Sequence, residues 1–154
     1  FLAGTPIPDT FVVTSGNAFE GTKHLEYQSA CGNGEAACYE NLRWQNVGVN
    51  MATLPAASFE SAYYEFAIAC NGGHSYWSDF RLSFGTNPLR NYNPLTVRCD
   101  GAYRLYQIPL RLFSANDGPL SFSELAAGLN EFTTPGGLWT AGTWVRVDEL
   151  RFRW

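Results

Sequence analysis

Aromatic and planar polar side chains gather in segments whose composition predicts loops. The chain contains 5 Trp, 8 Tyr and 11 Phe among 154 residues. Most Phe residues occupy alternating strand positions and are expected in the core, whereas several Trp and Tyr residues stand among Asn, Ser, Gly and Arg. An exposed ring among polar residues gains free energy when a ligand covers it. The candidate residues are His74, Tyr76, Trp77, Arg90, Asn91, Tyr92 and Trp139.

The chemistry of this set suits a sugar. The C–H faces of a sugar ring pack on a flat aromatic ring, and its hydroxyl groups need planar donors and acceptors. We therefore predict that the aromatic members stack on sugar rings and that the polar members bind hydroxyl groups. The alternative for Trp77 or Trp139 is that the indole caps one end of the core.

Motifs of the common hydrolases do not occur in the sequence. Glycosidases use two carboxyl groups that face one bond, but Asp148 and Glu149 are neighbours and point to opposite faces of a strand unless a bulge intervenes. Gly-x-Ser-x-Gly and His-Glu-x-x-His are both missing. A lyase cluster of Arg, Gln, His and Tyr, scattered along the chain, remains an alternative. We predict a binding module and no enzyme.

The final segment, Thr143–Trp154, alternates like a strand but slips once. Apolar residues alternate up to Val147 and resume one position out of phase at Leu150. The slip indicates a β-bulge at Asp148, which brings a carboxylate to the core side of the strand. An unpaired charge is costly there, so a cation is expected to meet it.

We predict that this cation is calcium, because carboxylate and backbone carbonyl oxygens are its preferred ligands. The turn from Asn17 to Lys23 is rich in turn-forming residues and is expected to supply the carbonyl groups. The alternative is that Asp148 pairs with an Arg of its own strand.

Strands with a period of two are predicted to position these residues. A change of phase near Gln45 indicates a second bulge. Residues 85–94 are predicted as a long loop because prolines disfavour a central strand, and residues 121–132 as the one short helix, capped by Ser121 or Ser123. The spacing is typical of an all-β sandwich. The strands are expected at 11–13, 23–29, 42–50, 63–71, 79–86, 95–99, 103–111 and 143–154.

Length and charge bound the possibilities further. A chain of 154 residues suits one domain, here residues 11–154, with residues 1–10 as a linker or edge segment. The net charge of −4 argues against nucleic-acid binding, which needs clustered Lys and Arg. No apolar run is long enough for a membrane span. We expect no signal peptide within the given segment and a module of a larger multi-domain protein.

The four cysteines are predicted to form two disulfides. Their spacing supports Cys31 with Cys38 and Cys70 with Cys99, and it does not suit a zinc site. Two disulfides would indicate an oxidising compartment. The alternative is four buried free thiols in a cytosolic protein.

Three short motifs resemble the β-jelly-roll carbohydrate-binding modules and related domains of bacterial surface glycan-binding proteins. They are Glu20–Leu25, Tyr103–Leu110 and Val147–Phe152. The resemblance implies a jelly roll of two antiparallel sheets that binds a polysaccharide or oligosaccharide without cleaving it. It also implies a structural calcium held by Asp148 and by carbonyl groups near Gly21 and Lys23. In these families the glycan binds on a concave sheet face or in loops at one end, and the absence of a row of Trp at alternating positions favours the loops.

The sequence therefore predicts an extracellular or cell-surface module that binds glycans. Two alternatives from other classes stay open. One is a polysaccharide lyase or glycoside hydrolase on the same scaffold. The other is a protein-interaction or structural domain whose loop aromatics face a partner chain.

Overall fold

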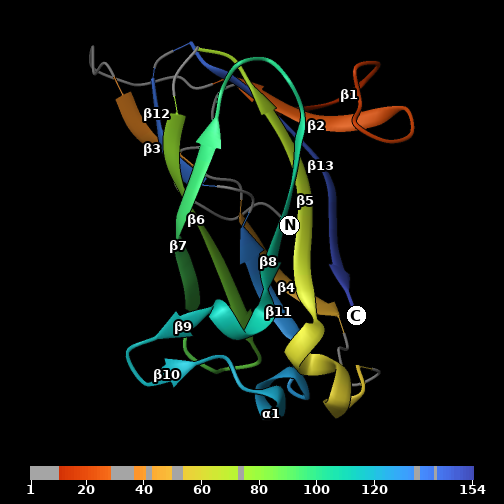
Figure 1. Cartoon of the computed structure of the whole chain (residues 1–154), viewed down its shortest axis with the longest axis vertical. Coiled ribbons are helices and arrows are strands. Elements are labelled where there is room, and N and C mark those ends of the chain that lie inside the picture. Colours follow the sequence, from red (N-terminus) through yellow and green to blue (C-terminus); the bar gives the residue numbers. More distant parts are fainter. Residues whose placement is uncertain are drawn as a thin grey trace.

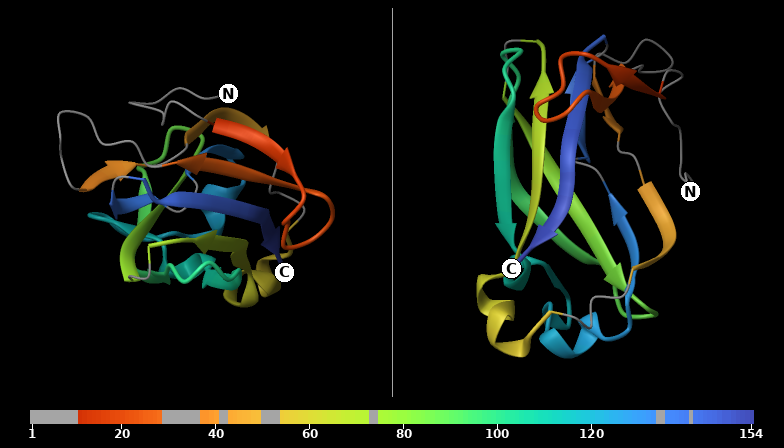
Figure 2. Two further views of the ribbon diagram at one scale, coloured as in Figure 1. Left: turned by 90° about the horizontal axis from the view of Figure 1, so that it is seen from above. Right: turned by 90° about the vertical axis from the view of Figure 1, so that its right-hand side faces the viewer.

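The computed structural model describes residues 11–28, 37–40, 43–49, 54–72, 75–133, 136–140 and 142–154. Within these residues two antiparallel sheets pack face to face, with short helical turns at one end (Figures 1 and 2). The structure thus confirms the predicted β-sandwich. The predicted linker at residues 1–10 lies outside the described residues. None of the helical segments in the described part of the chain has the length and apolar character needed to cross a bilayer.

The first sheet has five strands, and the last strand of the chain lies at its centre. The strands, in spatial order, are β1 (Phe11–Ser15), β2 (Lys23–Gln28), β13 (Trp144–Arg153), β5 (Tyr63–Cys70) and β8 (Arg104–Pro109). β13 pairs with β2 on one side and with β5 on the other. The C-terminal strand therefore completes the sheet, as its alternating pattern predicts.

The second sheet is larger and is built around β6. Its strands are β10 (Gly118–Pro119), β9 (Ser114–Ala115), β7 (Arg90–Arg98), β6 (Ser75–Phe84), β11 (Leu129–Thr133) and β4 (Arg43–Val49), with β12 (Gly136–Thr140) and β3 (Ala37–Glu40) branching from β6. β4 takes four steps from Gln45 to Val49 where β11 takes two. This irregularity confirms the predicted bulge near Gln45.

The core lies between the sheets and follows from strand alternation. β5 contributes Tyr64, Phe66 and Ile68, and β6 contributes Phe80 and Leu82, each at most 1% exposed. The ring centroids of Phe66 and Phe80 lie 4.4 Å apart across the two sheets. An aromatic contact of this kind stabilises a core by about 0.5–1.5 kcal/mol beyond the area it buries.

The bulge predicted in the last strand is present. β13 takes three steps from Asp148 to Arg151, whereas β5 takes two from Ala67 to Glu65. Glu149 adopts a φ of 56°, a left-handed conformation that is uncommon for a residue other than Gly. The extra residue accounts for the slip in the sequence pattern, in which apolar residues alternate up to Val147 and resume one position out of phase at Leu150.

Helical turns gather at one end of the sandwich (Figure 1). They are η1 (Ala56–Ser61), η2 (Leu110–Leu112) and α1 (Phe122–Leu125). The prediction of one helix over 121–132 was wrong in extent, because α1 is a single turn and residues 129–133 form β11. The N-cap prediction holds, since Ser121 and Glu124 form a capping box.

Two predicted loops are strands. β6 begins at Ser75 and β7 at Arg90, so the polar segment before Asp79 and much of 85–94 belong to the sheet. Pro94 is tolerated because β7 takes three steps from Leu95 to Tyr92 where β6 takes two. A proline at such an irregularity removes no regular ladder hydrogen bond.

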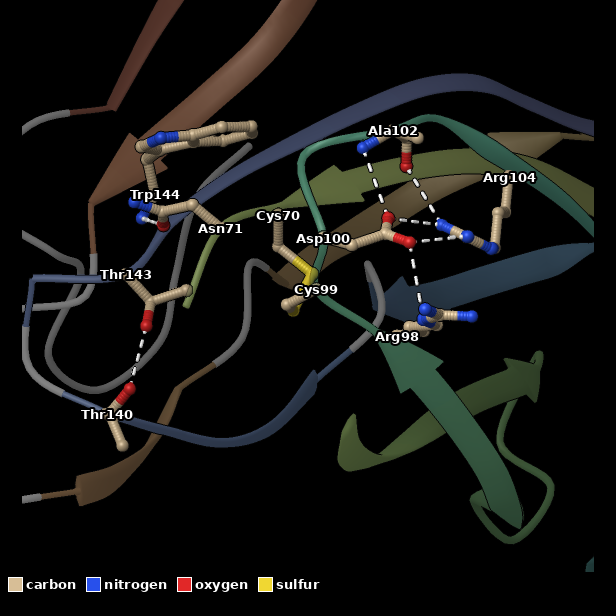
Figure 3. The surroundings of a disulfide bond; sticks show 10 residues. All are labelled: Cys70, Asn71, Arg98, Cys99, Asp100, Ala102, Arg104, Thr140, Thr143 and Trp144. Atoms are coloured by element: carbon tan, nitrogen blue, oxygen red, sulfur yellow. Dashed lines mark hydrogen bonds and ion pairs between the residues drawn. A yellow bond between two sulfur atoms is a disulfide. The ribbon is translucent and has the colours of Figure 1, made fainter. Parts of the chain in front are cut away.

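One disulfide joins the two sheets. Cys70 at the end of β5 is bonded to Cys99, which follows β7, as predicted (Figure 3). Both residues are fully buried. Beside the bond, Arg104 and Arg98 pair with Asp100. The hydrogen bond from Arg104 is the main reason that the pKa of the Asp100 carboxyl is lowered to about 2. Cys31 lies outside the described residues, so the pair with Cys38 stays a prediction.

Candidate functional site

The predicted ligand-binding residues lie on strands instead of in loops. They belong to three strands of the larger sheet: Tyr76 and Trp77 to β6, Arg90, Asn91 and Tyr92 to β7, and Trp139 to β12. The loop prediction was therefore wrong for these six, and His74 lies outside the described residues. Tyr and Trp have high strand propensity, and this propensity outweighed the polar neighbours on which the loop prediction rested.

The three strands are neighbours, with β6 in the middle. In the register of β6 and β7, Trp77 lies opposite Thr96, whose side chain is exposed. On the other side, Ser78 of β6 pairs with Gly137 of β12. The sheet therefore brings Trp77 and the strand of Trp139 close together, although they are far apart in sequence.

Polar side chains line the face of β6 that points away from the core. Arg81 and Ser83 alternate with buried Phe and Leu residues. Arg81 pairs in register with Asn91, and Ser83 with Glu131. The Thr133 hydroxyl accepts a hydrogen bond of 3.1 Å from the Arg81 backbone N–H. On this face the guanidinium of Arg81 and the amide of Asn91 are half-buried, whereas Ser83, Glu131 and Thr133 are buried. The alternation within 79–86 was the sequence signal for Arg81, and no signal indicated Glu131.

A hollow of about 420 Å³ lies at the end of this face. It is bounded by the turn that precedes β7 and by the turn that joins β9 and β10. Its walls are Pro88, Leu89, Asn91, Ala115, Asn116 and Asp117. Among the predicted residues, Asn91 reaches this hollow.

Arg90 has a structural role, which corrects its assignment to ligand hydroxyls. Its side chain is 6% exposed and lies between Asp117 and Glu124. Nε and one terminal nitrogen donate to Glu124 at 3.1 and 2.7 Å, and the two terminal nitrogens also donate to Asp117 and to the Gly118 carbonyl. A guanidinium has five N–H donors, and all are used. None is left for a sugar.

Tyr92 is the second correction. The residue pairs with Phe80 in register, and its ring packs against the core, 5.9 Å from the ring of Phe113. It shares the face of β7 that points into the sandwich. Tyr92 therefore does not offer an open ring on the outer face of the sheet.

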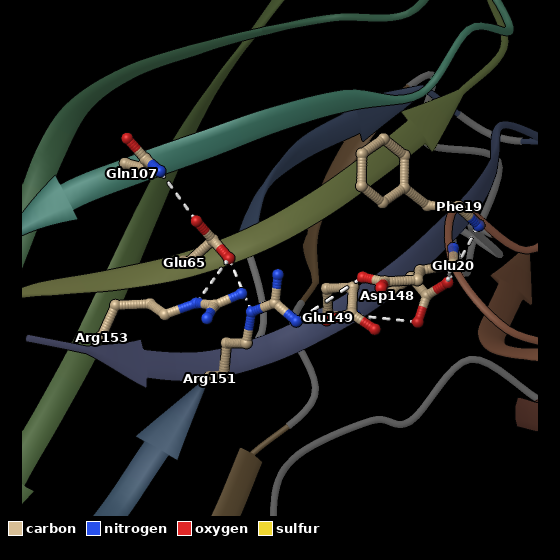
Figure 4. A network of polar contacts seen from close by, with 8 residues as sticks. All are labelled: Phe19, Glu20, Glu65, Gln107, Asp148, Glu149, Arg151 and Arg153. Atoms are coloured by element: carbon tan, nitrogen blue, oxygen red, sulfur yellow. Dashed lines mark hydrogen bonds and ion pairs between the residues drawn. The ribbon is translucent and has the colours of Figure 1, made fainter.

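The residues predicted to hold calcium lie on the opposite sheet and in the turn before β2. Both oxygens of Asp148 accept backbone hydrogen bonds: Oδ2 from Phe19 at 2.9 Å and Glu20 at 3.2 Å, and Oδ1 from Glu149 at 2.8 Å (Figure 4). The turn predicted to meet Asp148 does meet it, but through N–H groups. The ring of Phe19 lies 5.8 Å from Tyr103, whose pKa is raised to about 12 by burial and by the nearby Asp148.

The other predicted ligands surround this contact. Asn17 and Gly21 both have positive φ values in the turn, of 50° and 70°, and Lys23 lines a hollow of about 230 Å³ together with Asp148. Three of the about four acceptor positions of the carboxylate are occupied by N–H groups, so the residues leave little room for a cation as they stand. Among the described residues, no three His, Cys, Asp or Glu side chains converge on one point.

Ion pairs cover the outer face of the same sheet. Glu65 is buried and accepts from Gln107 at 2.7 Å, Arg151 at 2.6 Å and Arg153 at 3.3 Å (Figure 4). These hydrogen bonds, that of Gln107 first, lower the pKa of the Glu65 carboxyl. Further along, Arg146 pairs with Glu26 and lowers the pKa of that carboxyl through the hydrogen bond. The face is polar but internally neutralised.

Several solved structures share this fold. A family 30 carbohydrate-binding module is 16% identical, with a TM-score of 0.56 over 96% of this chain and 85% of that chain. The family 30 module of a cellulosomal cellulase of Clostridium thermocellum is 15% identical, with a TM-score of 0.58 over 96% and 84%. An exo-β-agarase is 13% identical, with a TM-score of 0.60 over 97% of this chain but 24% of that chain. The sequence matches no protein-family model and no curated protein. At these identities the likeness shows the fold, and it bears out the resemblance to carbohydrate-binding modules at that level.

Proposed function

We propose that this protein binds a polysaccharide or oligosaccharide without cleaving it, on the outer face of the larger sheet. The observation that carries the proposal is that Trp77, Trp139 and Asn91, all selected for sugar chemistry, lie on three neighbouring strands of that sheet. Arg81, half-buried on the same face, adds a planar donor beside Asn91. Aromatic rings and planar polar groups are what a sugar needs. The fold shared with two carbohydrate-binding modules supports the same function.

Three carboxyl groups with a shifted pKa do not suit the role of a general acid. A glycosidase needs a general acid whose pKa is raised. In the described part of the chain, Glu26, Glu65 and Glu124 each have a lowered pKa and each accepts a hydrogen bond from an Arg. Carboxyl groups held in this way remain ionised at neutral pH and donate no proton.

An enzyme is the second candidate, because the exo-β-agarase contains this fold. A titration of soluble glycans followed by Trp fluorescence separates the candidates, and the panel should include cello-oligosaccharides and agaro-oligosaccharides. Saturable quenching without new reducing or unsaturated ends supports binding. New ends identify a hydrolase or lyase. If no glycan of the panel changes the Trp fluorescence, the result supports the protein-interaction alternative and contradicts the proposal.

Trp77→Ala tests whether the indole stacks on a sugar ring. Loss of an aromatic anchor is expected to weaken glycan binding by about 1–3 kcal/mol while the melting temperature stays nearly unchanged. Calorimetric titration and thermal melts measure the two effects. Leu105→Ala, at an exposed position of β8 on the other sheet, is the control and should bind as the wild type does. A large fall in melting temperature for Trp77→Ala would assign the indole to the core instead.

We also propose that the chain acts outside the cell as one module of a larger protein. The disulfide between Cys70 and Cys99 supports an oxidising compartment. In the exo-β-agarase, the matched region is 24% of the chain, which supports a modular context.

A calcium ion beside Asp148 remains part of the proposal. Binding requires at least one of the N–H groups of Phe19, Glu20 and Glu149 to turn away, so that carbonyl groups of the turn replace it. If calcium binds, a strong chelator lowers the melting temperature of the wild type and leaves Asp148→Asn unchanged. If the chelator leaves the melting temperature of the wild type unchanged, the proposal of calcium at this site is wrong.

A further inference from the structure

We infer that the hollow between the turn before β7 and the β9–β10 turn is a second sugar-binding site, which holds another unit of the same glycan chain. The inference rests on the proposed function and extends it to a hollow that has no aromatic residue in its lining. The hollow measures about 420 Å³, and Asn91, Asn116 and Asp117 supply its polar groups. Pro88 and Leu89 supply apolar surface beside them.

The lining offers the two kinds of contact that a sugar makes. Each amide of Asn91 and Asn116 has two donors and an acceptor, which suit adjacent hydroxyl groups. Within the described residues, neither amide side chain is engaged in a hydrogen bond with the protein. The apolar C–H face of the ring can then pack on Pro88 and Leu89, so one sugar unit uses both walls.

Arg90 holds this site in a fixed shape. Its guanidinium donates to Asp117 and to the Gly118 carbonyl at 2.7 Å, which ties the β9–β10 turn to β7. The Asp117 side chain remains 53% exposed, so acceptor positions of the carboxylate still face solvent. A carboxylate that is already oriented loses little conformational freedom when a hydroxyl group binds.

The charges of the site select neutral sugars. Arg90 contributes one positive charge, and Asp117 and Glu124 contribute two negative charges around it. The balance is negative, so the carboxylate of a uronic acid would be repelled. A metal cation is not favoured either, because both oxygens of the Asp117 carboxylate already accept hydrogen bonds from the Arg90 guanidinium. The preferred ligand is therefore an uncharged sugar unit.

The distance from Trp77 makes this site a separate one. Arg81, the register partner of Asn91, lies four residues along β6 from Trp77, which corresponds to about 13 Å of strand. One sugar ring does not cover that span. A linear oligosaccharide that follows β6 and β7 reaches from the Trp77 position to the hollow, so affinity should rise with chain length.

The test is a length series of neutral oligosaccharides, using the cello- or agaro-series that the wild type binds. Calorimetric titration compares the wild type with Asn116→Ala, because Asn116 lines the hollow and has no part in the proposed Trp77 site. For the longest member, Asn116→Ala should bind about tenfold more weakly, the effect of losing one or two hydrogen bonds. For the shortest member that binds, affinity should equal that of the wild type. Asn87→Ala is the matched control, because Asn87 lies in the same turn but does not line the hollow.

The outcomes separate the two proposals. If the wild type binds short and long oligosaccharides equally, or Asn116→Ala binds every length like the wild type, the second site is wrong while the proposed function stands. If Trp77→Ala weakens binding at all lengths and Asn116→Ala weakens it at long lengths alone, both stand. If the wild type binds no glycan, the proposed function fails and the second site fails with it.

Discussion

The role of a polar residue in this protein depends on whether its donors and acceptors are already used by other residues. Arg90 and Asn91 are neighbours on β7, yet Arg90 is enclosed by Asp117 and Glu124 whereas Asn91 reaches a hollow. The sequence marked both as polar residues near aromatic ones and could not separate them. The partners of Arg90 lie 27 and 34 residues further along the chain, and a local pattern carries no information about such contacts.

Glu65 gives a prediction at this scale. The hydrogen bond from Gln107, and then those from Arg151 and Arg153, lower its pKa below the ordinary value of 4.5. The stabilisation from the ionised carboxylate is therefore complete above about pH 4.5 and is lost as the pH falls through the lowered folded-state pKa. Glu65→Gln should make the free energy of unfolding less dependent on pH in this acid range.

Chemical denaturation between about pH 5 and about pH 3 measures the effect. Glu60→Gln is the control, because the Glu60 side chain is 80% exposed and lies 3.9 Å from Arg111. Glu60→Gln should leave the fall in the free energy of unfolding at acid pH unchanged. If Glu65→Gln loses stability as steeply as the wild type when the pH falls, the Glu65 carboxyl does not control stability in acid.

Among the elements, the strands that are regular in sequence were predicted well and the irregular ones were not. Alternation located β5 and β13 closely, and the slip in phase located the bulge at Asp148. β11 was missed because most of it was assigned to the predicted helix over 121–132, and β12 because its Gly-rich segment lacks a period of two. Both become strands by pairing with β6. The loop assigned to the candidate site failed for the same reason, since neighbouring strands decided its structure.

Arg90 also joins elements, and its removal tests that role. It links β7 to the β9–β10 turn through Asp117 and to α1 through Glu124. Arg90→Leu should lower the free energy of unfolding by about 3–5 kcal/mol, because Glu124, whose side chain is 12% exposed, is left buried without its partner. Urea denaturation measures the loss.

Arg111→Ala is the matched control for that experiment. The Arg111 side chain is 52% exposed, and its pair with Glu60 spans 3.9 Å. An exposed pair contributes at most about 1 kcal/mol. Equal losses for the two variants would mean that Arg90 does not hold the elements together.

At the scale of the whole molecule, the sandwich is the part that sequence reasoning predicted most fully. Two sheets, a closing C-terminal strand and the Cys70–Cys99 bond all follow from alternation and spacing. The division of strands between the sheets did not follow, because it depends on pairing between distant segments. That division is what turns the candidate site from a loop cluster into a sheet face.

The inter-sheet disulfide provides the prediction at this scale. Cys70 and Cys99 are 29 residues apart, and closing such a loop stabilises the folded state by about 3.5 kcal/mol on the chain-entropy estimate. The double variant Cys70→Ala and Cys99→Ala should unfold at a correspondingly lower urea concentration than the oxidised wild type. A variant that unfolds at the wild-type concentration would show that packing alone holds the sheets together.

The same bond also sets how this protein responds to a mechanical load. It encloses β6 and β7 in a covalent ring, so a pull transmitted through the backbone passes from Cys70 directly to Cys99. The enclosed 29 steps correspond to about 100 Å of contour length that tension cannot release while the bond is intact. Under tension along the chain, the strands of Trp77 and Asn91 would thus stay within one covalent ring even when the rest of the chain is stretched.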